Sequence, residues 1–169
     1  YNNDGKNTNS HFFAKSNGKI GNNSSYNFQY QSVTNDEYLK LHNLSNSSEL
    51  ITNESLLTSK FYINTQIDQN TKLINEFFAY EDLSKKDSDR FQYVFPSFKF
   101  IKKVNTDENY NGNFYFNSTG YQKQYETNNY QAVLTNDFLF NSNNYISRKG
   151  FKSNYQFLIR HDNSFTSTP

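Results

Sequence analysis

The sequence predicts an all-β fold: an antiparallel up-and-down transmembrane β-barrel that is incomplete, with about eight strands in a curved open sheet. Aromatic residues make up 18% of the chain, yet its mean hydropathy is −0.96. Apolar and polar residues alternate with period two in successive segments, which is typical of half-buried strands. Several segments reach the roughly 9–11 residues of a tilted bilayer-spanning strand, whereas globular strands average about 5–6.

The expected strands share this alternation and are bounded by polar, turn-forming residues. In the clearest of them, Phe61 and Ile63 lie on one face while Lys60 and Asn64 lie on the other. The segments are residues 10–16, 26–31, 57–68, 72–82, 91–102, 110–118, 130–141 and 151–160. Connectors such as Asn17-Gly18 and residues 68–70 are read as turns, so we expect antiparallel hairpins.

One connection, residues 34–53, is longer than the others. Within it we expect a single helical turn at residues 36–41, with Asp36 as its N-cap. Outer-membrane barrels carry their long loops on the extracellular side. We therefore expect this connection to lie outside the cell.

The alternation changes phase once. Phe91, Tyr93 and Phe95 share one parity, whereas Phe98 falls on the other, and Pro96 stands between them. Proline cannot donate to a strand ladder, and an extra residue at a bulge reverses the parity that follows. The interpretation is a bulge at Pro96-Ser97, and the alternative is a break between two shorter strands.

Parity also predicts which side chains share a face. We expect one continuous apolar face toward lipid, made by Phe28, Tyr30, Phe61, Ile63, Phe114, Phe116, Tyr155 and Phe157. We expect a polar face toward the lumen, made by Asn27, Gln29, Lys60, Asn64, Asn154 and Gln156. Tyrosines near strand ends are expected in the aromatic girdles of a barrel, namely Tyr80, Tyr93, Tyr110, Tyr130 and Tyr145.

Other classes of function find little support in the residues. A net charge of +1 with scattered Lys and Arg does not favour nucleic acid. There is no cysteine, and His11, His42 and His161 are far apart, so we interpret them as surface or lumen residues. The acidic residues around 81–89 are interpreted as a solvated turn. We assign no catalytic, cofactor-binding or metal-binding residue, and we do not expect an enzyme.

Several phrases of the sequence together resemble one known family. They are YQSVTNDEYLK at residues 30–40, AYEDL at 79–83, SDRFQYVFPSF at 88–98, NDF at 136–138 and the strand from Gly150. In this order they resemble the barrel domain of LptD, the LPS-assembly or organic-solvent-tolerance protein family. The resemblance covers most of residues 26–160, and none of its phrases is a catalytic signature.

The resemblance implies a place and partners. Residues 1–169 would be a middle segment of one outer-membrane β-barrel domain, with the N-terminal jelly-roll domain and the remaining strands outside this sequence. The Gram-negative cell outer membrane would be its location. Its partners would be lipopolysaccharide, outer-membrane lipid, a plug lipoprotein and periplasmic bridge proteins. Lipopolysaccharide would cross the lumen and leave between the first and last strands of the full barrel. No lateral-gate or plug-contact residue can be assigned.

Two alternatives stay open at this stage. One is another outer-membrane barrel, either porin-like or a complete small one, because eight strands can close on themselves. The other is a soluble β-sandwich that serves as an adhesin or glycan-binding module.

Overall fold

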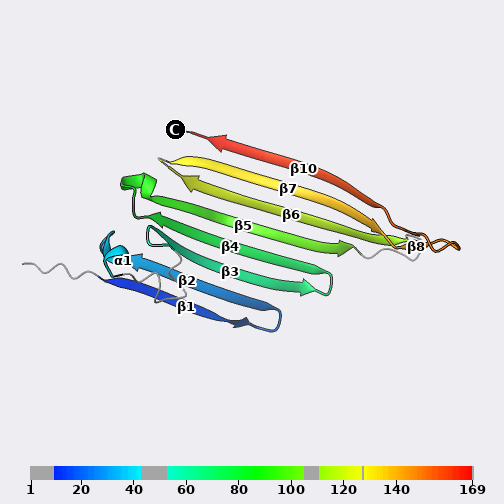
Figure 1. Cartoon of the computed structure of the whole chain (residues 1–169), viewed down its shortest axis with the longest axis horizontal. Coiled ribbons are helices and arrows are strands. Elements are labelled where there is room, and N and C mark those ends of the chain that lie inside the picture. The colour runs from blue at the N-terminus through cyan, green and yellow to red at the C-terminus, as the bar shows by residue number, and fades with distance from the viewer. Residues whose placement is uncertain (1–9, 43–52, 105–110, 127, 169) are drawn as a thin grey trace, which may run out of the picture.

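The structure, a computed structural model, describes residues 10–42, 53–104, 111–126 and 128–168. Long strands form one antiparallel sheet in the order β1-β2-β3-β4-β5-β6-β7-β10 (Figure 1). The strands are β1 (His11–Ile20), β2 (Ser24–Val33), β3 (Leu56–Asp68), β4 (Thr71–Asp82), β5 (Phe91–Val104), β6 (Gly112–Tyr125), β7 (Asn129–Ser142) and β10 (Gln156–Ser167). The all-β, up-and-down prediction is confirmed.

Short elements lie only at the two ends of the sheet. The helix α1 (Tyr38–Leu41) and the 3-10 turn η2 (Asp87–Arg90) lie at one end, which we call the helix end (Figure 1). The opposite end, the hairpin end, carries the β1–β2 and β3–β4 turns and a small hairpin of β8 (Tyr145–Ile146) and β9 (Lys152–Ser153). In the described residues no helix has the length and apolarity to span a membrane.

Several boundaries differ from the sequence prediction. Asn17 and Gly18 lie inside β1, paired with Asn27 and Tyr26, so the turn expected there is wrong. The last strand begins at Gln156 rather than at residue 151 and continues to Ser167. The reason is local: Gly150 has a positive φ of 81° and donates to Ser147 O at 2.9 Å, which turns the chain back as the β8–β9 hairpin.

The predicted helical turn is present, but its cap is not Asp36. The helix begins at Tyr38, and its N-cap position, Glu37, makes no side-chain cap hydrogen bond. Instead the Asn35 side chain accepts the Glu37 N–H at 2.9 Å, an Asx turn that leads the chain into the helix. The Asp36 carboxylate instead binds Arg90.

A bulge is present at Pro96 as predicted, but its two residues are Phe95 and Pro96 rather than Pro96 and Ser97. Glu76 pairs with Ser97 and Phe78 pairs with Val94, so Phe95 and Pro96 together stand opposite a single residue of β4. The same shift occurs against β6, between Val94 and Ser97. The extra residue restores Phe95 and Phe98 to one face of the sheet.

The sheet is open. Among the described residues β1 pairs only with β2, and β10 pairs only with β7. The alternative of a complete eight-stranded barrel is therefore not what this sheet forms. Both ends also mix short and long connections: residues 34–55 and 126–128 at the helix end, 21–23 and 143–155 at the hairpin end. The extracellular placement of residues 34–53 stays a prediction, because loop length does not distinguish the ends.

Glycines inside the strands make room for aromatic rings. A Cβ at Gly18 would lie 2.8 Å from the Tyr26 ring, and one at Gly120 would lie 2.6 Å from the Phe98 ring. In both cases the ring belongs to the residue directly paired with the glycine. An aromatic side chain lying over a cross-strand glycine compensates for the glycine's missing packing surface.

This packing gives a stability prediction. Gly120→Ala should lower the free energy of unfolding in detergent by about 1–3 kcal/mol, because the Phe98 ring must move. Thr119→Ala, the neighbouring change on the opposite face, should stay within about 0.5 kcal/mol of the parent. Denaturant titration of both variants measures this, and equal effects would show that the ring does not depend on the glycine.

Candidate functional site: the two faces of the sheet

Directly paired residues of a sheet point to the same side, so the ladder registers place each strand side chain on one of two faces. One of them, the aromatic face, holds most of the phenylalanines of the chain and four tyrosines. They are Phe12, Phe28, Phe61, Phe77, Phe91, Phe95, Phe98, Phe100, Phe114, Phe116, Phe138, Phe140, Phe157 and Phe165, with Tyr26, Tyr30, Tyr93 and Tyr130.

The opposite face, the polar face, holds most of the charged strand residues. They are Lys15, Lys19, Lys60, Lys72, Glu76, Asp82, Lys99, Lys103, Lys123, Asp137, Arg160 and Asp162. The predicted division is confirmed for every listed residue inside the ladders. Asn154 and Tyr155 precede β10, and the Tyr155 ring lies 5.7 Å from Phe140 of the aromatic face. Which medium each face meets stays a prediction.

Among the strand residues of the aromatic face, only Asp68, Glu81 and Lys102 are acidic or basic at neutral pH, and Asp68 pairs with Thr71, as Lys102 does. Glu81 lies near the helix end of β4, and Lys102 pairs with Thr71 at the hairpin end of the same strand. At about 3.4 Å per residue the separation along β4 is roughly 34 Å. Tilted by about 40°, this spans roughly 26 Å, close to the apolar band of about 25 Å on outer-membrane barrels.

The aromatic rings contact one another across the strands. Phe61 lies 6.4 Å from Phe28 and 6.0 Å from Phe77, and Phe77 lies 4.8 Å from Phe95. A second row joins Phe116 to Phe100 at 6.1 Å and to Phe138 at 4.9 Å. These separations fall within the range of favourable ring pairs. The rows fix the register of six neighbouring strands from one side.

The aromatic face has no covering layer in the described part of the chain. Phe95, Phe138 and Phe165 are 64%, 53% and 60% exposed. In the same part of the chain only Leu39, Leu57 and Leu83 are buried hydrophobic residues, and they form one small cluster at the helix end. An exposed apolar surface that runs over a whole sheet indicates contact with lipid or with another protein layer.

A polar group interrupts the aromatic face near the β10 edge. Ser118 pairs with Asn136, which pairs with His161, and Asn163 lies two residues further along β10 on the same face. The interpretation of His161 as a surface or lumen residue did not foresee this. The signal was present in the parity of β10, because His161 has the same parity as Phe157.

The tyrosine girdle is only partly as predicted. Tyr93 and Tyr130 lie on the aromatic face near the helix end. Tyr80 pairs with Gln92 on the polar face, so its assignment was wrong. Tyr145 lies in the β8–β9 hairpin, and Tyr110 is outside the described residues. Tyr30 joins Tyr93 and Tyr130 at the helix end of the aromatic face.

Among the acidic residues of the predicted solvated turn, Glu81 forms an ion pair and Asp82 forms hydrogen bonds. Arg90 binds Glu81 at 2.6 Å and Asp36 at 2.7 Å. These partners raise the pKa of Arg90, Asp36 contributing most. The Asp82 carboxylate accepts the Ser84 N–H at 3.0 Å. No group of three or more His, Cys, Asp or Glu side chains that could hold a metal ion occurs in the described residues.

Two further ion pairs are more exposed. Lys85 binds Glu126 at 3.1 Å, which raises the pKa of Lys85 and joins the β4–β5 connection to the end of β6. On the polar face, Arg160 of β10 binds the carboxylate of Asp137 on β7 through two nitrogens, at 2.7 and 2.9 Å. Exposed pairs of this kind contribute about 0–1 kcal/mol each.

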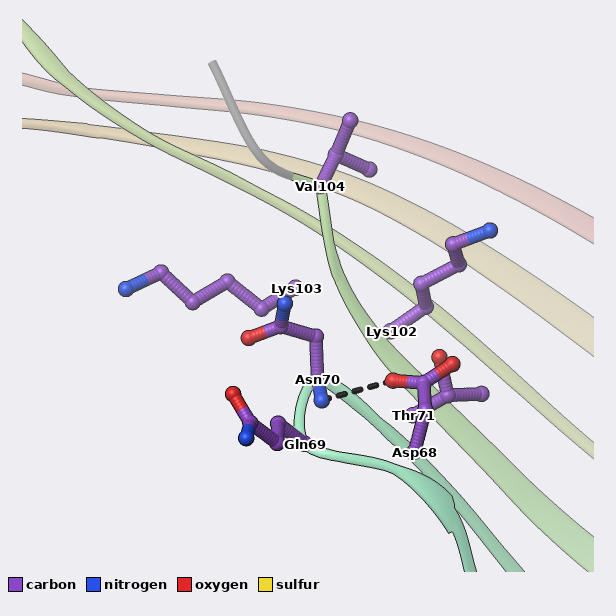
Figure 2. A pocket seen from close by; sticks show the side chains of 7 residues that line it. All are labelled: Asp68, Gln69, Asn70, Thr71, Lys102, Lys103 and Val104. Carbon is purple, nitrogen blue, oxygen red and sulfur yellow. Dashed lines mark hydrogen bonds between the residues drawn. The ribbon is translucent and has the colours of Figure 1, made fainter.

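An open hollow lies at the hairpin end, beside the β3–β4 turn (Figure 2). The Asp68 carboxylate accepts the Asn70 N–H at 2.7 Å, which shapes the turn. Lys102 and Lys103 extend to opposite sides, as Figure 2 shows, because consecutive strand residues face opposite ways. The two ammonium groups therefore do not converge on a common ligand.

No family model, curated protein or solved structure matches this chain. The two faces of the sheet are therefore the main evidence about function.

Proposed function

We propose that this chain is a section of the wall of an outer-membrane β-barrel, with the aromatic face toward lipid and the polar face toward the lumen. One observation supports it most. The aromatic face is exposed, and its charged strand residues lie at its two ends, Glu81 at one end and Asp68 and Lys102 at the other, separated by about the height of the apolar band of such barrels. The free edges of β1 and β10 would pair with further strands of the same wall, since hydrocarbon tolerates no open sheet edge.

We further propose that the barrel belongs to an LptD-like system. It would assemble lipopolysaccharide into the outer leaflet of the outer membrane, with a plug lipoprotein and periplasmic bridge proteins as partners. The support is the order of sequence phrases that resemble the family, together with a polar face rich in lysine and amide side chains. Movement of lipopolysaccharide along such a face would make or break no covalent bond. A porin-like wall is the competing membrane function, and a sandwich with a second covering sheet is the competing soluble one.

Spin labels distinguish the membrane wall from the sandwich. Nitroxides at Ile63 and Asn64, adjacent residues on opposite faces of β3, should differ in lipid vesicles. Oxygen, which concentrates in hydrocarbon, should relax the label at Ile63 more strongly, and a water-soluble nickel chelate should relax the label at Asn64. Equal accessibility at the two sites would contradict the wall.

A charge placed on each face gives an energetic test of the same proposal. Ile63→Arg should lower the stability of the lipid-inserted protein by about 2–4 kcal/mol, because the guanidinium would face hydrocarbon. Asn64→Arg should have a much smaller effect, since that position faces water. Chemical unfolding from vesicles measures both, and similar losses would contradict the assignment of the faces.

Crosslinking tests the lipopolysaccharide proposal separately from the wall. A photoreactive residue at Asn64 or Asn117, both on the polar face, should capture newly made lipopolysaccharide in living cells. Capture should fall when its synthesis is blocked, whereas a label at Asn22 in the β1–β2 turn should capture less throughout. Absence of capture from the polar face, with the spin labels as expected, would leave a wall of porin type.

A further inference from the structure

The junction between β2 and β3 is backbone-paired along only half of its length. Its ladder runs from Ser24–Thr65 to Gln29–Lys60 and stops there. Both strands continue toward the helix end, where residues 30–33 pair with β1 and residues 56–59 pair with β4. The β6–β7 ladder, by comparison, runs from Gly112–Ser142 to Tyr125–Asn129, the full length of both strands.

Side chains occupy the place of the missing ladder. The Gln31 N–H donates to Ser59 Oγ at 3.1 Å, and that hydroxyl donates back to Gln31 O at 3.4 Å. From the other face, Gln29 Nε2 donates to Thr58 O at 3.4 Å. A side-chain hydroxyl and an amide therefore hold the strands together where backbone groups do so elsewhere. Such contacts are longer and fewer than a ladder.

The helix α1 packs at this half of the junction. Leu39 is 0% exposed and contacts Leu57 of β3, which is 1% exposed, and Leu83 beyond β4. Val33, the last residue of β2, packs against the same cluster. The only hydrophobic cluster in the described residues thus lies where the β2–β3 ladder is absent.

Arg90 fastens the segment that leads into α1. Its guanidinium donates to both carboxylate oxygens of Asp36, at 2.7 and 3.0 Å, and through Nε to Glu81 at 2.8 Å. The Arg90 and Glu81 side chains are only 20% and 21% exposed, so solvent screens this pair less than a surface pair. Glu81 belongs to β4, and Asp36 follows β2. These two ion pairs of Arg90, which we call the clamp, therefore cross the half of the β2–β3 junction that has no backbone ladder.

We propose that the helix-end half of the β2–β3 junction is a latched lateral seam, which separates when Arg90 releases Asp36 and Leu39 leaves its cluster. Opening would separate residues 30–33 of β2 from residues 56–59 of β3 at the helix end, and it does not depend on the proposed function. The hairpin-end half, with its full ladder, stays closed.

Backbone hydrogen exchange of the full chain in lipid nanodiscs tests the seam. Arg90→Gln removes both ion pairs, and the amides of residues 30–33 and 56–59 that point across the junction should then exchange at least about tenfold faster, whereas the alternate amides stay paired with β1 and β4. The Gln31 amide is the direct reporter because it donates to Ser59 Oγ. Residues 24–29 and 60–65 should change by less than about twofold, because their ladder remains.

Arg160→Gln is the matched control, since it breaks a two-nitrogen ion pair between strands whose ladder is complete. It should leave exchange at the seam unchanged. Asp36→Asn is a milder variant that keeps the Arg90–Glu81 pair, and it should accelerate the same amides by a smaller factor.

Three outcomes would overturn the seam. Exchange could accelerate in both halves of the junction together, or it could stay unchanged at the seam in both Arg90→Gln and Asp36→Asn. The third outcome is that Arg160→Gln accelerates exchange at the seam as much as Arg90→Gln does. The spin labels at Ile63 and Asn64, measured in the same nanodiscs, report the lipid exposure of the aromatic face. If exchange at the seam is unchanged but the two labels differ as expected, only the seam is refuted. If exchange at the seam accelerates but the two labels do not differ, only the membrane wall is refuted.

Discussion

The alternation of side chains along an extended strand is the constraint on which the other features depend. Consecutive residues must face opposite ways, and directly paired residues must face the same way. Once Phe61 pairs with Phe28 and Phe77, every strand residue connected to them by register is assigned a face. A shift by one residue would exchange phenylalanine for lysine across the sheet. The contacts between rings, and the glycines beneath Tyr26 and Phe98, exist only in the observed register.

The bulge at Pro96 follows from this constraint. Without it Phe98 and Phe100 would turn to the polar face, and the row from Phe100 through Phe116 to Phe138 would not form. The two residues of β5 that oppose one residue of β4 restore the parity within a single strand. A proline suits this position, because a bulged residue needs no N–H in the ladder. The aromatic rows on the two sides of the bulge therefore lie on the same face.

Local patterns in the sequence predicted the strands, the two faces and the bulge, since parity is visible in consecutive residues. They could not predict pairs between distant residues. Asp36 was expected as a helix cap, yet its partner is Arg90, and no local pattern connects the two. Asn17-Gly18 was read as a turn. The ring that lies over Gly18 belongs to Tyr26 on the next strand, so consecutive residues did not show that Gly18 is a strand residue. The polar group around His161 was not predicted, because the last strand was expected to end at residue 160 and it continues to Ser167.

The two ends of the sheet are held together by different interactions, and this difference bears on how the structure can move. At the hairpin end β2 and β3 are held by backbone pairs, which are numerous and mutually supporting. At the helix end they are held by Ser59, by Leu39 and by the clamp of Arg90 on Asp36. Local opening follows the least cooperative contacts of a fold. Loss of one guanidinium contact frees a connection, whereas loss of one ladder bond leaves its neighbours in place. Motion in this sheet should therefore begin between β2 and β3, at the end where α1 lies, and stop where the ladder begins at Gln29.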